Sequence, residues 1–179
     1  MSAARFEFQG LVGGYGSTMI LRGISGAIAP GEVLFVLGRN GVGKSTLMKV
    51  LMGFLPCREG TVRLDGREIT ALAPPGRRRA GITYCPQEGA VFDALSVGDN
   101  LFLMAPPEAP ARLERLAGRF PLLRRRRDQR AGTLSGGEKK ILSFVRGAIE
   151  DHALVLLDEP AERVQAENIE RMEAVIGEQ

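Results

Sequence analysis

The stretch GRNGVGKST, residues 38–46, decides the fold. It has the form G-x-x-x-x-G-K-[ST], with Gly38, Gly43, Lys44 and Ser45 at the fixed positions. Glycines let successive backbone N–H groups turn toward phosphate oxygens, and a helix that begins here presents its positive end to the same anion. We therefore expect this phosphate loop to bind a nucleotide, with Lys44 on the β- and γ-phosphates and the Ser45 hydroxyl on Mg²⁺.

The sequence around the loop predicts an α/β fold. EVLFVLG, residues 32–38, is almost continuously apolar, which is typical of a strand covered on both faces in a parallel sheet. A helix is predicted at 43–53, and helical spacing of apolar residues dominates 95–150. Further strands are predicted at 5–12, 20–31, 61–66, 81–87 and 153–159, and a last helix at about 164–177. Strands before and after a helical block predict one α/β domain with an inserted lobe.

Composition narrows the class of protein. The 179 residues suffice for one domain with a lobe, and 44% hydrophobic with 25% charged residues is usual for a soluble globular protein. Apolar runs such as residues 153–157 are far shorter than the roughly 20 residues that cross a bilayer. The N-terminus has no apolar segment typical of a secretory signal, so we expect a cytoplasmic protein. Cys57 and Cys85 are expected to be reduced packing residues.

The net charge of +3 comes mostly from arginines, clustered at 77–79 and 124–130. Such runs occur in solvated helix ends and loops, and also in surfaces that bind nucleic acid. No aromatic residues are interleaved with the arginines, as stacking on bases would require. We therefore favour solvated helix ends and expect no nucleic-acid partner.

An acid pair, Asp158 and Glu159, follows the apolar residues 153–157. A carboxylate at the end of a buried strand is costly unless it meets a cation or hydrogen-bond donors. Mg²⁺ held at the phosphate loop is such a cation, so Asp158 is predicted to hold it through water. Glu159 is predicted to polarise the water that attacks the γ-phosphate.

The segment LSGGE, residues 134–138, begins an amphipathic helix, so Ser135, Gly136 and Gly137 form a second helix N-terminus suited to anions. We call residues 134–138 the signature segment. One nucleotide does not need two such sites from the same subunit unless they lie on opposite sides of a dimer.

The order GRNGVGKST, CPQ, LSGGE, LVLLDEP resembles the ATP-binding cassette (ABC) ATPases over essentially the whole chain. The resemblance implies a P-loop NTPase core with an N-terminal antiparallel β subdomain and an inserted α-helical lobe. Within a single domain, 1–179, residues 1–87 would hold the β subdomain and the phosphate-loop part of the core. Residues 88–150 would be the lobe, and 151–179 the acid-pair strand and last helix.

The resemblance also implies a head-to-tail dimer, homomeric or heteromeric, in which the signature segment of one subunit closes over ATP on the other. Gln87 would sense Mg²⁺ and the transmembrane partner, and Tyr15 would stack on adenine, although an aromatic at a strand end is also a usual core or surface residue. Catalytic roles fall to Glu159 and Gln87. The implied ATP contacts are Tyr15, Gly38, Asn40, Gly41, Gly43, Lys44, Ser45, Thr46, Ser135, Gly136 and Gly137, and the implied Mg²⁺ contacts are Ser45, Gln87 and Asp158.

Residues 38–56, 67–87 and 164–172 resemble most the ATP-binding subunits of uptake systems for branched-chain amino acids, and also those for urea. Such subunits lie on the inner face of the cell membrane and work with two permeases and, indirectly, a solute-binding protein. The segment 88–101 would face the permease. Its Val91, Phe92 and Leu95 would either line that contact or pack the lobe.

The chain departs from the family pattern after Glu159. Ala161, Arg163 and Ala166 stand where the family has a serine or threonine, a glycine and often a proline. The family also carries a switch histidine on the strand after the last helix. The one histidine here, His152, precedes the acid pair and is predicted to be a surface residue. We therefore expect a chain that is short at its C-terminus, and keep open a subunit that binds ATP without independent turnover.

Overall fold

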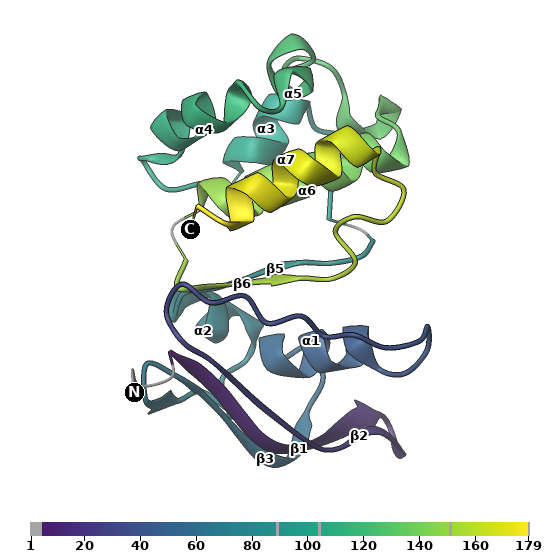
Figure 1. Ribbon diagram of the computed structural model, residues 1–179, viewed down its shortest axis with the longest axis vertical. Coiled ribbons are helices and arrows are strands. Elements are labelled where there is room, and N and C mark those ends of the chain that lie inside the picture. The colour runs from purple at the N-terminus through teal and green to yellow at the C-terminus, as the bar shows by residue number, and fades with distance from the viewer. Residues whose placement is uncertain (1–4, 89, 104, 151, 179) are drawn as a thin grey trace. The chain divides into compact units, whose positions relative to one another are not determined.

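A computed structural model describes residues 5–88, 90–103, 105–150 and 152–178 (Figure 1). The chain divides into two compact units, residues 1–82 and 83–179, which are described separately. An antiparallel sheet near the N-terminus and a block of helices in the second half are both present, as predicted. In the described part of the chain, no helix has the length and apolar character needed to span a membrane.

The first unit is an antiparallel sheet with two helices. The strands β1 (Phe6–Tyr15), β2 (Thr18–Ile28), β3 (Cys57–Leu64) and β4 (Arg67–Glu68) lie in the order β2-β1-β3-β4. Phe6 and Phe8 of β1 are buried on either side of the less buried Glu7, as alternation along a strand requires. Leu11 is also buried, after a shift in the β1–β2 register between Phe8 and Leu11. The helices are α1 (Lys44–Met52) and α2 (Pro74–Arg79). Leu47, Val50 and Leu51 of α1 are buried in the core of this unit.

The second unit is mostly helical (Figure 1). Two short strands, β5 (Ile82–Cys85) and β6 (Leu154–Leu157), form a two-stranded sheet. β5 begins at the boundary between the units. One cluster of buried apolar residues unites the helices, with Phe120 and Phe144 in edge-to-face contact at its centre. The helices are α3 (Val97–Phe102), α4 (Ala109–Ala117), α5 (Pro121–Arg125), the 3-10 turn η1 (Ala131–Thr133), α6 (Gly136–Ile149) and α7 (Ala166–Ile176).

The predicted strand at 32–38 is wrong. These residues form neither strand nor helix, and the side chains of Phe35 and Leu37 are 76% and 87% exposed. A parallel strand needs hydrogen-bonding neighbours, and the described sheets contain no strand paired with this segment. An apolar run alone therefore does not produce a strand when its partners are not supplied.

Two predictions of solvent exposure are also wrong. Arg77 is only 1% exposed, whereas a solvated helix end was expected; its neighbour Arg79 is exposed as predicted. The His152 side chain is 10% exposed, because its Nε2 pairs with the buried Glu150 carboxylate at 2.5 Å. In both cases a specific partner in the interior outweighs the general preference of these residues for water.

Candidate functional site

The phosphate loop belongs to the first unit and leads directly into α1. Gly43, the N-cap of α1, has φ 110°, and Gly41 has φ 80°, backbone conformations that favour glycine. A Cβ at Gly43 would also lie 2.7 Å from Ile20 Cγ2. The Lys44 ammonium group donates to the carbonyl oxygens of Gly38 at 3.1 Å and Arg39 at 3.3 Å. The Lys44 side chain thus folds back over the loop. A phosphate bound there would replace these carbonyl oxygens as the partner of the ammonium group.

The opposite end of α1 is held by the buried Arg77. Its Nη1 donates to the carbonyl oxygens of Val50 at 2.7 Å and Leu51 at 2.6 Å, which belong to the last turn of the helix. Its Nη2 and Nε donate to Thr70 and Leu72 carbonyls at 2.6 and 3.0 Å. A cation at a helix C-terminus is favourable, and here it fixes the helix that carries the phosphate loop at its other end.

Tyr15 ends β1 and is 48% exposed. Lys49 of α1 donates to its hydroxyl at 3.3 Å, and the ammonium nitrogen lies 5.8 Å from the ring centroid. The first unit therefore brings Tyr15 against the same helix that begins at the phosphate loop.

Asp158 of the acid pair is buried in the second unit, with 4% exposure. Its Oδ2 accepts a hydrogen bond from the Tyr84 hydroxyl at 3.1 Å, and its N–H donates to the Cys85 carbonyl at 3.0 Å. The extension of the β5–β6 pairing past Leu157 therefore fixes the backbone of Asp158, and Tyr84 orients its carboxylate.

Glu159 lies within hydrogen-bonding distance of the predicted glutamine, Gln87. Gln87 Nε2 donates to Glu159 Oε2 at 2.8 Å and to Glu162 Oε2 at 3.1 Å. Lys140 of α6 donates to the Glu159 carbonyl oxygen at 3.1 Å. Glu159 also has φ 49°, a left-handed conformation that costs a non-glycine residue about 1–2 kcal/mol. A strained residue held by several contacts is characteristic of functional sites.

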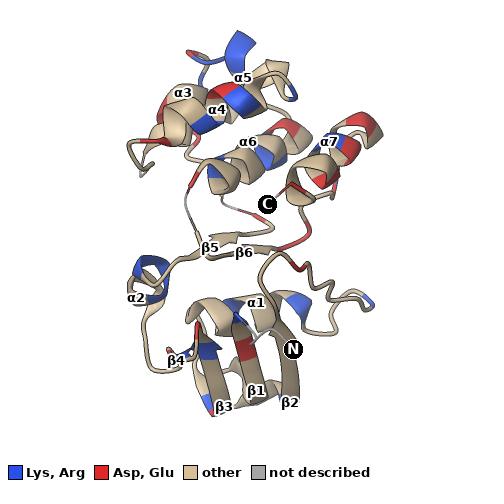
Figure 2. Cartoon of the chain, turned by 60° about the vertical axis from the view of Figure 1, so that its left-hand side comes forward, with Lys and Arg blue, Asp and Glu red and all other residues tan. Residues whose placement is uncertain are grey.

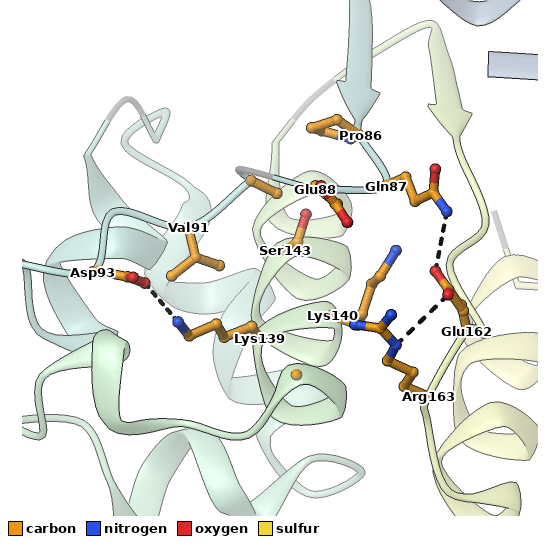
Figure 3. Close-up of a pocket in the computed structure, with 12 residues that line it drawn as sticks. Pro86, Gln87, Glu88, Val91, Asp93, Lys139, Lys140, Ser143, Glu162 and Arg163 are labelled. Carbon is orange, nitrogen blue, oxygen red and sulfur yellow. Dashed lines mark hydrogen bonds and ion pairs between the residues drawn. The ribbon is translucent and has the colours of Figure 1, made fainter.

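A cleft of about 240 Å³ adjoins this cluster in the second unit. Figure 3 shows Gln87 at its edge, with the amide nitrogen turned toward Glu162. Both signs of charge line it, and the lining residues are Pro86, Gln87, Glu88, Ala90, Val91, Asp93, Gly136, Lys139, Lys140, Ser143, Glu162 and Arg163.

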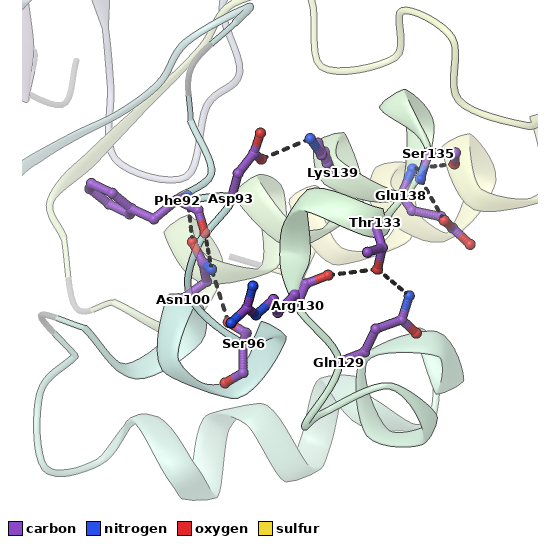
Figure 4. Close-up of polar contacts among 10 residues, drawn as sticks. All are labelled: Phe92, Asp93, Ser96, Asn100, Gln129, Arg130, Thr133, Ser135, Glu138 and Lys139. Carbon is purple, nitrogen blue, oxygen red and sulfur yellow. Dashed lines mark hydrogen bonds and ion pairs between the residues drawn. The ribbon is translucent and has the colours of Figure 1, made fainter.

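The signature segment forms the N-terminus of α6. Ser135 is the N-cap, and a capping box joins it to Glu138: the Ser135 N–H donates to Glu138 Oε2 at 2.8 Å, and the Glu138 N–H donates to Ser135 Oγ at 3.3 Å (Figure 4). Gly137 lies against the chain that follows Glu159, since a Cβ there would be 2.4 Å from the Arg163 carbonyl oxygen. At Gly136 a Cβ would meet only Arg163 Cδ, at 3.9 Å.

Some side chains of the segment 88–101 pack inside the lobe, and others are exposed to solvent. Val91 packs against the core of the lobe, Leu95 is partly buried, and Phe92 is 53% exposed. The buried Asn100 accepts from the Phe92 N–H at 2.8 Å and donates to its carbonyl oxygen at 3.0 Å (Figure 4). The Phe92 backbone is thus fixed while its ring remains on the surface.

The residues implied for Mg²⁺ supply suitable donors. Ser45, Gln87 and Asp158 offer hydroxyl, amide and carboxylate oxygens, which are the ligands that Mg²⁺ prefers. In the second unit, Gln87 uses its amide nitrogen toward the two glutamates, so its carbonyl oxygen remains for a cation or its water. No cluster of three or more His, Cys, Asp or Glu side chains that could bind a metal occurs among the described residues.

Three contributors to the second-unit cluster were not predicted: Tyr84, Lys140 and Glu162. Tyr84 precedes Gln87 by three residues, and Glu162 follows Glu159 by three. Their closeness in sequence to predicted site residues could therefore have identified both. Lys140 of α6 approaches Glu159 from a position 19 residues earlier in the sequence. Such a contact depends on tertiary structure alone.

Comparison with known proteins gives a consistent result. The family model described as "ABC transporter" matches residues 21–162. The chain is 34% identical over 151 residues to the high-affinity branched-chain amino acid transport ATP-binding protein BraG of Pseudomonas aeruginosa, covering 82% of this chain and 65% of that protein. It is 38% identical over 151 residues to a probable branched-chain amino acid transport ATP-binding protein, LivF, of Archaeoglobus fulgidus, covering 82% and 64%.

One further relative is named for a different transport system, and one solved structure has a similar fold. The lipopolysaccharide export system ATP-binding protein LptB of Acidithiobacillus ferridurans is 34% identical, with 86% of this chain and 66% of that protein covered. A solved ATP-binding subunit of an ABC transporter superposes with a TM-score of 0.85 at 25% identity, covering 97% and 73%. The chain thus spans just under two thirds of the length of the relatives that it matches.

Proposed function

Because the chain belongs to the ABC transporter ATP-binding family, we propose that it is the ATP-binding part of an ABC importer, which couples ATP binding and hydrolysis to uptake of branched-chain amino acids or a related small solute. The observation that carries the proposal is the cluster of Gln87, Asp158 and Glu159. Residues more than 70 positions apart in the sequence meet in one unit, as a site for Mg²⁺ and water requires.

The substrate class rests on the two relatives named for branched-chain amino acid transport. A relative named for lipopolysaccharide export matches almost as well, so the family does not define the substrate. The segments 38–56, 67–87 and 164–172, which resemble the branched-chain subunits, favour the importer.

The chemistry proposed for this chain is electrostatic positioning followed by proton abstraction. Lys44 and the backbone N–H groups of the phosphate loop bind the β- and γ-phosphates, and Tyr15 stacks on adenine. Mg²⁺, when bound, neutralises phosphate charge, and Ser45, Gln87 and Asp158 are the residues that would hold it. Glu159 accepts a hydrogen bond from the attacking water and acts as the general base that takes its proton, while the Gln87 amide orients the Glu159 carboxylate.

ATP binding without independent turnover is the second candidate function. The segment that precedes the phosphate loop, 32–38, has no ladder partner among the described strands, although its apolar side chains are those of a buried strand. The phosphate loop is followed by α1, but among the described residues no paired strand directly precedes it, so its position is less well fixed than it would be between a paired strand and a helix. A displacement of about 1 Å at a catalytic site can reduce the rate about a hundredfold.

Steady-state ATP hydrolysis with Mg²⁺ distinguishes the two functions. Turnover by the 179-residue chain that falls at least about a hundredfold in Glu159→Gln supports catalysis by the acid pair. Binding of ATP by both proteins with no turnover in either supports the second candidate. An Arg79→Gln variant, which changes an exposed side chain of the first unit, is the control and should hydrolyse ATP at the parent rate.

The proposed assembly is a dimer with a second ABC ATPase subunit, homomeric or heteromeric, on the inner face of the cell membrane. Permease subunits would contact the segment 88–101, where Phe92 is exposed, and a solute-binding protein would act through them. Co-purification of the chain with permeases, compared with Phe92→Asp, tests this arrangement. Equal recovery of permease with both proteins would exclude Phe92 from the contact.

A further inference from the structure

Glu138, in the first turn of α6, has two separate partners. Its Oε2 accepts from the backbone N–H of Ser135 at 2.8 Å as part of the capping box (Figure 4). Arg126 Nη1 lies 3.2 Å from Glu138 Oε1 and 3.4 Å from Oε2. The glutamate side chain is 24% exposed and the arginine 41%, so the pair lies at the surface beside the helix N-terminus.

The capping glutamate conflicts with the proposed role of this helix end. The inference rests on the proposed function, in which the N-terminus of α6 receives a phosphate of ATP held by a second subunit. Helix N–H groups and the helix dipole favour that anion. Glu138, however, places a negative charge in the first turn and uses the Ser135 N–H as a donor. When two subunits close and exclude water, repulsion between this carboxylate and the triphosphate grows.

We propose that Arg126 is a positioning residue that cancels the charge of Glu138 and thereby lets the signature segment accept an ATP phosphate from a second subunit. The capping hydrogen bond between Glu138 and Ser135 is kept, so the start of α6 stays ordered. The Glu138–Arg126 pair has no net charge. This gives a function to one member of the arginine run 124–130.

The backbone of Arg126 is held on both sides. Its N–H donates to the Leu122 carbonyl at 3.0 Å, and its own carbonyl accepts from the Gln129 N–H at 3.0 Å. The next residues are tied to the start of α3, because the N–H groups of Gly98 and Val97 donate to the carbonyls of Arg127 and Gln129 at 2.8 and 2.9 Å. The guanidinium group therefore reaches Glu138 from a fixed base.

Other arginines of the run have different neighbours. Figure 2 shows basic residues gathered at α5 and the chain that follows it. Arg124 pairs with the exposed Glu114, and the Arg127 guanidinium lies 5.9 Å from the centroid of the Phe102 ring. Arg124 is thus a matched control for Arg126: it carries the same charge, two residues away, and its partner, Glu114 of α4, is not part of the signature segment.

The test measures ATP-driven dimerisation of the whole chain by sedimentation, with Mg²⁺ and a slowly hydrolysed ATP analogue. Arg126→Gln should weaken dimerisation about tenfold, whereas Arg124→Gln should leave it within about twofold of the parent. Glu138→Gln keeps an amide oxygen for the Ser135 N–H and removes the charge. In that background, Arg126→Gln should have no further effect on dimerisation. Melting temperature and nucleotide binding by the monomer are measured on each variant.

The double variant separates charge compensation from a purely structural role. If Arg126 only stabilised the lobe, Arg126→Gln would lower the melting temperature and Glu138→Gln would not rescue dimerisation; that result overturns the proposal. Equal dimerisation of Arg126→Gln and the parent overturns it also, while leaving the proposed function intact. A parent chain that binds the analogue but never dimerises contradicts the proposed assembly, and the role of Arg126 falls with it.

Discussion

Replacement of the buried Arg77 by methionine is expected to destabilise the first unit severely. Arg77→Met keeps a long side chain but removes the guanidinium donors to the carbonyls of Val50, Leu51, Thr70 and Leu72, which Arg77 contacts at 2.6–3.0 Å. Burial lowers the pKa of the Arg77 guanidinium, yet no ordinary pH neutralises it.

The size of the effect follows from two opposing terms. Four carbonyls, two buried and two partly buried, each lose a charge-assisted hydrogen bond, at about 1–3 kcal/mol for a group left unsatisfied; the Val50 carbonyl keeps the Gly53 N–H as a donor. The variant also avoids the cost of burying a guanidinium, which is several kcal/mol. Because the lost hydrogen bonds outweigh the avoided burial cost, we expect a net loss of about 3–5 kcal/mol. Because a domain has only about 5–15 kcal/mol in total, the change is large.

Urea unfolding monitored by circular dichroism measures this loss, with Arg79→Met as the control. Arg79 is exposed in the same helix, so its replacement should change the free energy of unfolding by less than about 0.5 kcal/mol. If Arg77→Met lies within 1 kcal/mol of the parent, the four hydrogen bonds do not hold α1 and the reasoning is refuted.

The signature glycines and a buried cysteine give two more tests. Gly137→Ala should destabilise the chain by about 1–3 kcal/mol, because its Cβ would lie 2.4 Å from the Arg163 carbonyl oxygen; Gly136→Ala, with open space, should be neutral or stabilising in urea unfolding. Burial raises the pKa of Cys85 from 9.0 to about 11, so the folded chain retains a proton that the unfolded chain loses. Stability should therefore fall by about 2 kcal/mol as the pH rises from 9 to 11, and Cys85→Ala should remove that part of the decline; the same slope in both proteins would assign it to other groups.

Local patterns predicted the elements that depend on neighbouring residues. The glycines of 38–46 and the helical spacing after them located α1, found at Lys44–Met52, and the alternation of 5–12 located β1. The signature segment was likewise predicted to begin a helix, and α6 begins there, at Gly136. In each case the conformation is determined within a few residues, so the sequence carries the information.

Features that depend on distant partners were predicted less well. The run 32–38 has strand composition, but a ladder requires another strand beside it, and none of the described strands fills that place. Arg77 resembled a solvated residue because two of its four carbonyl partners, Val50 and Leu51, come from α1, some 26 residues earlier. The Tyr84–Asp158 contact joins positions 74 residues apart, and no local pattern encodes it.

Equilibrium binding of a labelled ATP analogue with Mg²⁺ to the 179-residue chain and to Lys44→Ala tests directly whether the phosphate loop binds ATP. The control is Arg63→Ala, which removes an equal charge from an exposed site on β3. We expect Lys44→Ala to lose at least about tenfold in affinity, since the phosphates lose the ammonium group that lies over the loop, while Arg63→Ala binds like the parent. Equal affinity of all three proteins would contradict the assignment of residues 38–46 as an ATP-binding phosphate loop.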